Sequence, residues 1–499
     1  MQKLLIIFVF SIPFLASAQL NNYWSQNFND ESSLLAGAVV GGGAGPSAIY
    51  FNPATISEIN ESKLSLNASL FSFEVLKASN ALGDGIDLNS SKGYVIPRFL
   101  SYMLKPKKYT KWSFEVAFLN LANLSTEGVN YVNKNIDILS NIPDEEKYTA
   151  FYKLSTRYRD DWLGIGGSYK LNENLSLGTS LFASFFSQYY YRTLQINTIP
   201  IINDLENLPD SYYISSYSEE EEAKFNDYRL MWKFGVFYKK DQYGFGLNIS
   251  TPTLSGIYSD GKRVMRRRSQ NNITDPESGE PKNDFLFLDY EEKKKVMVKS
   301  KSPFSIAAGI TYNNFDKTKI LYFTAQYFAE IKPYAIIKAK RDPSTEDNSF
   351  LQNEGYRHFL TFVEGGKPVF NAAIGYKWFV KENLMLLAGF KTDFNYEKDY
   401  DLKPFSNELT FKSFNFNKFH ITGGSTAHIF GQDVTAGIQY SLGFLNNQKQ
   451  IVNLSDPVEY NNVEQKALQG TRLKNMKTIY NSVSIYFAAT FNFGSGKTD

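Results

Sequence analysis

The feature that most constrains this chain is a two-residue alternation of apolar with small or polar side chains that recurs along its length. In residues 479–494, Val483, Ile485 and Phe487 alternate with two serines and a tyrosine. Similar alternations cover 384–395 and 434–443. Because successive side chains of a β-strand point to opposite faces, each of these segments predicts a strand with one apolar face.

About fourteen such segments can be counted, which lies in the size range of transmembrane barrels, and an even number returns both ends to one side. They begin near Leu64, Tyr94, Trp112, Tyr152, Leu175, Tyr228, Tyr243, Val296, Ile320, Val369, Leu384, Phe416, Val434 and Tyr480. The predicted fold class is therefore all-β, a transmembrane antiparallel β-barrel of about fourteen strands.

The connections between these segments alternate in length. Short links lie at 105–110, 171–174, 239–242, 313–318, 380–383 and 430–433. Long polar links include 197–223, 260–292 and 446–475. Short turns at one end and long loops at the other are typical of outer-membrane barrels, whose short turns face the periplasm.

A soluble β-sandwich or a two-domain all-β protein is the alternative, since its strands would also alternate. A sandwich gives no reason for long and short links to segregate. Its inner faces also pack on another sheet, whereas the predicted inner face here carries Lys391, Asp393, Lys418 and His420. A barrel lumen accommodates such residues, so the barrel is the better prediction.

The first residues indicate export. Lys3 precedes an apolar run over residues 4–14, and Ala16-Ser17-Ala18 is a small-residue cleavage site, so we expect a signal peptide over 1–18 and a mature chain from Gln19. No later stretch of about 18 apolar residues predicts a spanning helix. The chain has no cysteine, which leaves neither a lipoprotein anchor nor disulfides.

Composition agrees with a barrel in an outer membrane. Aromatic residues make up 16% of the chain, which suits strands and the aromatic girdles of a barrel. Mean hydropathy is nevertheless −0.33, because only alternate residues of a barrel strand need be apolar. A net charge of +2 gives no argument for nucleic-acid binding.

A segment rich in small residues, 34–54, precedes the first strand and ends in Asn52-Pro53-Ala54. It resembles the N-terminal plug of the outer-membrane long-chain fatty-acid transporter family (FadL/TodX-like), whose members are also called outer membrane protein transport proteins. Residues 162–178, 302–312 and 370–389 are similar to strand blocks of that family. The resemblance implies fourteen strands and transport of long-chain fatty acids or similar hydrophobic compounds. The sequence departs from the family pattern in two places: residues follow the aromatic Phe493 at the end of the last strand, and the 260–292 loop is large.

The expected organisation is a signal peptide (1–18), an N-terminal plug or hatch (19–60) and the barrel (61–499). Small residues from Ala36 to Ala48 can pack tightly inside a lumen, and Pro53 stiffens the chain. A flexible linker with a chance Asn-Pro-Ala is the alternative. The glycines of 41–45 also suggest a phosphate loop, but no Gly-Lys-Ser/Thr follows. We predict that Asn52 and Pro53 hold the plug closed.

The sequence contains no recognised catalytic constellation. A Gly-x-Ser-x-Gly elbow, a His-Glu-x-x-His motif and a cysteine nucleophile are all missing from it, and its three histidines lack metal spacing. We therefore expect no enzyme, no metal and no cofactor. Candidate ligand-binding residues in the lumen are His420, Lys391 and Arg98. For His420, which should point inward, the alternative is a side chain hydrogen-bonded within the wall.

Charged segments give further candidates. Arg263, Arg266, Arg267 and Arg268 lie in the 260–292 loop and are possible anion-binding residues, for lipopolysaccharide phosphates or fatty-acid carboxylates, with a solvated loop face as the alternative. Glu219 to Glu222 are expected to serve solubility.

Pro97 and the glycines at 164, 166 and 167 are candidates for irregularities in the barrel wall, with ordinary packing adjustments as the alternative.

The sequence thus predicts a monomeric outer-membrane protein for passive uptake of long-chain fatty acids or other hydrophobic compounds, in contact with outer-membrane lipids and lipopolysaccharide. Its main rival is a non-transport role like that of the PorV branch of the family, which resembles a partner for secretion or surface attachment of proteins. A surface lipid hydrolase is a third class, for which no nucleophile and base are visible.

Overall fold

The structure is a computed structural model that describes residues 22–24, 30–140, 144–201, 215–274, 281–292, 297–337, 362–397, 414, 416–464 and 466–492. Within the described strands, the side chains of 263–274 and 281–292 and those of 68–70, 94, 96, 97 and 492 are not described.

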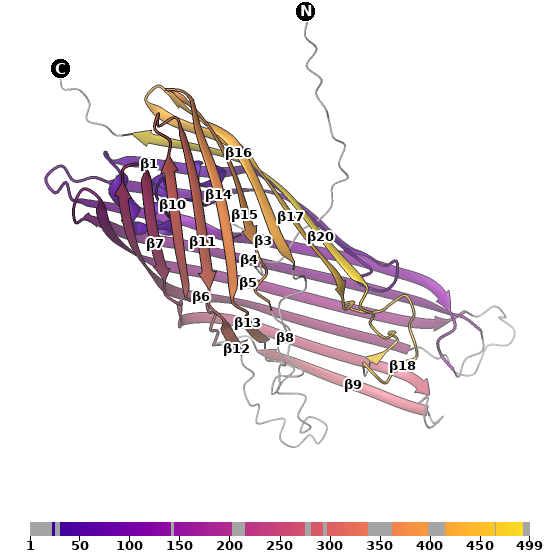
Figure 1. The fold of residues 1–499 in the computed structure, drawn as a ribbon. Helices are drawn as coiled ribbons and strands as arrows, with labels where there is room; N and C mark the ends of the chain where they lie inside the picture. The colour runs from indigo at the N-terminus through magenta and orange to yellow at the C-terminus, as the bar shows by residue number, and fades with distance from the viewer. Residues whose placement is uncertain are drawn as a thin grey trace, which may run out of the picture.

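Fourteen antiparallel strands form a closed barrel (Figure 1). They are β1 (Lys63–Ser79), β2 (Leu88–Leu104), β3 (Trp112–Ile136), β4 (Glu146–Lys170), β5 (Leu175–Pro200), β6 (Ser215–Lys240), β7 (Tyr243–Ser250), β10 (Ser305–Asn313), β11 (Lys319–Phe328), β14 (Val369–Lys381), β15 (Leu384–Asp393), β16 (Asn417–Ile429), β17 (Gln432–Gln448) and β20 (Met476–Asn492). Each pairs with the next in this order, and β20 pairs with β1 to close the ring. The predicted fold class is confirmed.

Most predicted strand positions are confirmed, and β2 and β4 begin six residues earlier than predicted. Two predictions are wrong: β6 begins at Ser215 rather than near Tyr228, and β10 begins at Ser305 rather than near Val296. The predicted long link over 197–223 is therefore shorter, because β5 runs to Pro200.

The prediction of a long loop over 260–292 is wrong, because β8 (Leu254–Thr274) and β9 (Pro281–Glu292) form a hairpin there. The first half of β6, from Ser216 to Leu230, pairs with β8, and its last residues, from Lys233 to Lys240, pair with β7. The hairpin forms because β6 projects beyond β7, and β8 satisfies the exposed backbone edge.

Two small sheets complete the described strands. They pair β12 (Ile331–Ile337) with β13 (Phe362–Gly366) and β18 (Tyr460–Asn461) with β19 (Lys466–Ala467).

The outer face of the barrel carries an apolar band. On β6, the outward side chains from Tyr228 to Tyr238 are apolar or aromatic, and Phe234 is 49% exposed. This span of about 11 residues is about 25 Å high at a tilt of about 40°, the height of a membrane band. Other strands around the barrel continue it with exposed Ile165 of β4, Phe323 of β11 and Ile438 of β17.

Aromatic pairs lie at both edges of the band. At the end of the barrel that carries the short turns, Trp112 packs on Tyr169 with ring centroids 4.9 Å apart. At the other edge of the band, Phe185 packs on Tyr228 with ring centroids 5.6 Å apart. We call the two ends of the barrel the turn end and the loop end. Paired aromatic residues at both edges are the girdles expected at two membrane surfaces.

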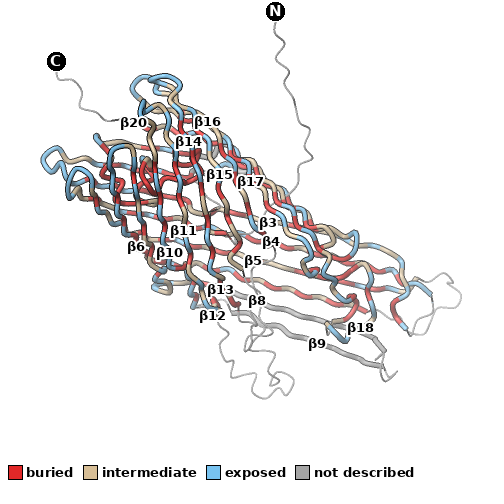
Figure 2. Tube along the Cα trace, viewed as in Figure 1, coloured by how far each residue is buried: buried red, intermediate tan, exposed pale blue. Residues whose placement is uncertain are grey.

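The wall is uneven in height. Strands β3 to β6 have 25 or 26 residues each, whereas β10, β11 and β15 have 9 or 10. The long strands therefore project past the short ones at the loop end, and their buried inner faces continue there (Figure 2). None of the helices in the described part of the chain is long and apolar enough to cross a bilayer.

Candidate functional site

An N-terminal segment, residues 30–58, lies inside the turn end of the barrel. It contains α1 (Asp30–Leu34), η1 (Gly45–Ser47), α2 (Ala48–Phe51) and η2 (Pro53–Glu58). Wall hydroxyls donate to its backbone carbonyls from widely separated strands: Ser101 of β2 to Pro46, Ser180 of β5 to Ile49, Thr311 of β10 to Gly41 and Thr422 of β16 to Leu34, at 2.6–3.2 Å. The segment is thus bonded around the whole circumference of the lumen.

Asn52 ties this segment together and to the wall. It is fully buried, and its Nδ2 donates to the carbonyls of Val40 (2.9 Å) and Val236 on β6 (3.1 Å). Its Oδ1 accepts the backbone N–H of Ala54 at 3.1 Å. Asn52 therefore caps η2, whose first residue is Pro53, a residue with no N–H to satisfy at a helix start.

Glycines of the wall make room for the segment. A Cβ at Gly178 would overlap the backbone of Pro53, and one at Gly235 would overlap Oδ1 of Asn52. A Cβ at Gly246 would overlap the carbonyl oxygen of Val40. A glycine within a strand often marks the close approach of another backbone. These glycines could therefore have been predicted from the sequence, but they were missed.

The prediction that Gly164, Gly166 and Gly167 make the wall irregular is wrong, because the β3–β4 ladder runs without a register shift from Trp112 opposite Tyr169 to Asn120 opposite Asp161. These glycines give room instead to side chains, of which Phe182 at Gly164 is the closest. They are packing adjustments.

The irregularity lies near Pro97. The β1–β2 register shifts between Asn67 and Ala68, opposite this proline, and the β2–β3 ladder covers only Phe99–Leu104. On β3 the register with β4 shifts between Asn120 and Ala122. The wall therefore loses its backbone hydrogen bonds between β2 and β3 at this height.

A cavity of about 30 Å³ lies on the N-terminal segment, and Tyr50, Phe51, Lys233 and Lys391 are among its lining residues. Lys233 of β6 is 4% exposed, and its Nζ lies 3.9 Å from the ring centroid of Tyr50. Among the described residues, no carboxylate forms an ion pair with this ammonium group. A buried cation facing an aromatic ring and an apolar floor can bind an acidic head group.

A second cavity, of about 90 Å³, is lined by Tyr158, Asp160, Arg229 and Glu364, among others. Arg229 and Asp160 form a buried ion pair, and Ser184 accepts from Arg229 at 2.8 Å. Leu121 lines both cavities, next to the β3 register shift. Both cavities therefore extend to the part of the wall where the β2–β3 ladder is interrupted.

Of the three predicted ligand-binding residues, Lys391 is the one that lines either of these two cavities, and its Nζ donates to the carbonyl of Trp24 at 2.5 Å. His420 points inward, as predicted, but its Nδ1 shares a hydrogen bond with Ser441 at 2.7 Å and its Nε2 lies 3.5 Å from Asp393. Arg98 is buried in β2 where the register with β1 shifts. Lys233 was missed, although its inward place between Trp232 and Phe234 follows from the same alternation.

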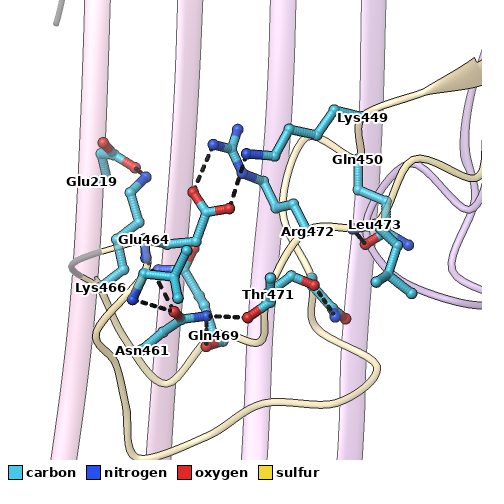
Figure 3. A network of polar contacts seen from close by, with 12 residues as sticks. Glu219, Lys449, Gln450, Asn461, Glu464, Lys466, Gln469, Thr471, Arg472 and Leu473 are labelled. Carbon is cyan, nitrogen blue, oxygen red and sulfur yellow. Dashed lines mark hydrogen bonds and ion pairs between the residues drawn. The ribbon is translucent and has the colours of Figure 1, made fainter.

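Residues 449–464 and 466–475, which we call the cap, contact the loop end of the barrel at Tyr148 of β4 and Glu219 of β6. Figure 3 shows a network of polar contacts within the cap and with Glu219. Glu464 of the cap accepts a hydrogen bond from Arg472 at 2.7 Å and forms an ion pair with Lys449 at 3.1 Å. Lys466 reaches Glu219 of β6 at 3.2 Å. Burial alone would raise the pKa of Glu464, but the bonds from Arg472 and Lys449 lower it to about 2.

The prediction that Glu219 to Glu222 only serve solubility is wrong. Glu219 and Glu221 are buried, because alternate residues of β6 point into the lumen. Arg192 of β5 pairs with both, at 3.0 and 3.6 Å. Half of this acidic run thus binds the cap and the inner wall.

The arginines at 263, 266, 267 and 268 lie on β8 rather than in a loop, opposite 223, 220, 219 and 218 of β6. Their side chains lie outside the described part of the structure, so their predicted anion binding stays a prediction. Nor do the described residues contain a group of three His, Cys, Asp or Glu side chains that could hold a metal ion.

The sequence matches no family model and no curated protein. Solved structures share its fold. A FadL homologue from Pseudomonas aeruginosa has 12% identity and a TM-score of 0.53 and covers 95% of this chain and 100% of its own. The P. putida toluene transporter TodX has 15% identity and a TM-score of 0.52, with 94% and 99% covered. The Ralstonia pickettii toluene transporter TbuX has 12% and 0.50, with 94% and 98% covered. The chain therefore has the FadL/TodX barrel fold, and its apolar band indicates a β-barrel that spans a membrane.

Proposed function

We propose that this protein carries hydrophobic monocarboxylic acids, such as long-chain fatty acids, passively inward across the outer membrane. The observation that carries the proposal is the buried Lys233 ammonium, which faces a cavity with an apolar floor and forms no ion pair with a described carboxylate. A carboxylate head group would supply that counter-charge, and a hydrocarbon tail would lie along apolar lumen residues such as Leu154, Phe186 and Phe225.

The N-terminal segment acts as the plug in this proposal. Its bonds to wall strands around the lumen block a straight aqueous path, so an apolar solute needs another way out. The interruption of the β2–β3 ladder begins at Asn120, which the strand register aligns with Phe185 and Tyr228 at the loop-end edge of the apolar band. It lies beside Leu121, which lines both cavities. A solute released there would pass sideways into lipid without crossing the plug, so no energy source is needed.

The test compares two solutes of equal length and different head group. In proteoliposomes, Lys233→Met should lower uptake of oleate about tenfold, because one charge-assisted contact of about 1.4 kcal/mol is lost. Uptake of oleyl alcohol should not change. Lys317→Met, at an exposed turn, is the control with the same charge change.

Equal uptake of oleate by the wild type and Lys233→Met would contradict a carboxylate site at Lys233. If the protein moved neither solute, the transport proposal itself would be wrong. Native mass spectrometry of the purified protein then separates the rival role: bound acyl chains support transport, whereas a co-purified secreted protein supports a partner for secretion or attachment.

A further inference from the structure

A row of mostly basic side chains crosses the outer face of the long wall. The strand register aligns Ser125, Arg157, Tyr189, Lys224 and Lys262 on β3, β4, β5, β6 and β8. We call these five residues the basic row. Their neighbours Tyr190 and Phe225 are buried in the lumen, so by the alternation of a strand the row faces outward.

The basic row lies just past the apolar band. Its members on β5 and β6, Tyr189 and Lys224, come four residues from Phe185 and Tyr228, the aromatic pair at the band's upper edge. Four residues are about 13 Å along a strand, or about 10 Å in height at a tilt of about 40°. This height is the zone of lipid phosphates and sugars rather than of hydrocarbon.

Two cations of the row have no acidic partner of their own. Arg157 and Lys224 are exposed on either side of Tyr189, two strand spacings or about 10 Å apart. No ion pair joins either of them to a carboxylate in the described part of the chain.

Three of the nearby acids are already paired with other cations. Glu127 pairs with Lys153 at 2.9 Å and with Lys92 at 4.0 Å. Glu222 pairs with Lys262 at 2.9 Å, and Asp161 pairs with Arg159. These three acids therefore do not neutralise Arg157 or Lys224, and the exposed Asp260 of β8 lies opposite Asn226 rather than opposite Lys224.

We propose that the basic row binds the two phosphates of a lipid A molecule, the membrane anchor of lipopolysaccharide. Arg157 and Lys224 each contact one phosphate, and the acyl chains lie against the apolar band directly beneath. A free phosphate or a soluble polyanion would gain nothing from that band, whereas an anionic lipid with two phosphates on one sugar head group uses both features. This site is separate from the lumen and does not depend on the transported solute.

The test measures lipid retention by the full-length protein in detergent, using native mass spectrometry with added lipid A. The wild type should retain bisphosphorylated lipid A, and Arg157→Gln with Lys224→Gln should lower its apparent affinity about tenfold or more. Lys107→Gln with Lys108→Gln removes the same charge at an exposed turn and should change nothing. Arg157 and Lys224 are both exposed, so heat-modifiable gel migration should stay normal in either double variant.

Equal retention by the wild type and the Arg157/Lys224 variant would overturn the site. Equal loss of lipid A in both double variants would also overturn the site, because binding would then follow the net charge of the protein rather than these two residues. Wild-type binding of dephosphorylated lipid A as tight as that of the bisphosphate would rule out phosphate recognition. Equally tight binding of phosphatidylglycerol would overturn the assignment to lipid A and leave a general site for anionic lipids.

Discussion

The two ends of the lumen are closed by different physical means. At the turn end, backbone carbonyls of the N-terminal segment accept hydrogen bonds from serine and threonine hydroxyls of the wall. Wall glycines lie so close to the segment that they leave no space for a side chain. At the loop end, the cap contacts the wall through long charged side chains, such as Lys466 on Glu219. The first closure depends mainly on volume, whereas the second combines charge with buried apolar contacts such as those of Leu468. The turn end should therefore respond to one added methyl group, and the loop end to pH and salt.

The largest effect is expected from a single methyl group at the turn end. Gly235→Ala places a Cβ on Oδ1 of Asn52, so the N-terminal segment must move or the variant must lose about 1–3 kcal/mol of stability. Single-channel conductance in planar bilayers should rise well above that of the wild type.

Gly423→Ala is the matched control for this variant. Its added Cβ meets only the carbonyl oxygen of Leu387, at 3.9 Å, which is ordinary contact. If both alanine variants leave conductance at the wild-type value, the close fit between wall and segment is not what closes the turn end.

A smaller effect is expected from Asn52→Ala, which removes two donated and one accepted hydrogen bond without adding volume. Each lost hydrogen bond costs about 1 kcal/mol, so the loss of stability is similar to that of Gly235→Ala, but no added atom displaces the segment and the change in conductance is therefore smaller. Leakage or oleate uptake should change, while barrel assembly and surface abundance stay normal, because the strand ladders do not use this side chain.

Asn52→Asp separates the contributions of the two ends of this side chain. It keeps the acceptor for Ala54 but replaces the donor to Val40 and Val236. Uptake equal to the wild type in both variants, at equal abundance, would show that Asn52 does not hold the segment.

The smallest effect is expected at the cap, where pH provides the perturbation. The pKa of Glu464 is lowered from 4.5 to about 2, so its ion pairs are complete above 4.5 and are lost as pH falls toward 2. The chain has no cysteine, so Val463→Cys can carry a single spin label on the cap. Label mobility should stay constant from pH 7 to 4 and increase only below that.

Arg472→Ala removes one partner of Glu464 and should bring the carboxyl nearer to its ordinary pKa. The mobility increase should then occur at higher pH than in the protein with Arg472 intact. The same transition pH in both proteins would mean that the cap is held by contacts other than Glu464.

Strand positions could be predicted because the alternation of side chains is a local property. The pattern at 384–395 alone places Lys391 and Asp393 inside, and the structure buries both. The acidic run at 219–222 was misjudged because its charges were counted without applying that alternation. Glu219 and Glu221 point inward and Glu222 outward, and their roles differ accordingly.

The sequence by itself determined the barrel, its strand number and the short turns, because a strand with one apolar face must bury or embed that face whatever its partners are. Only the tertiary structure decided which glycines leave room for the N-terminal segment and which inward lysine lines a cavity. It also decided where the β2–β3 ladder stops. These features join residues far apart in the chain, such as Asn52 with Val236, and their closeness follows from the closure of the barrel and not from any local pattern.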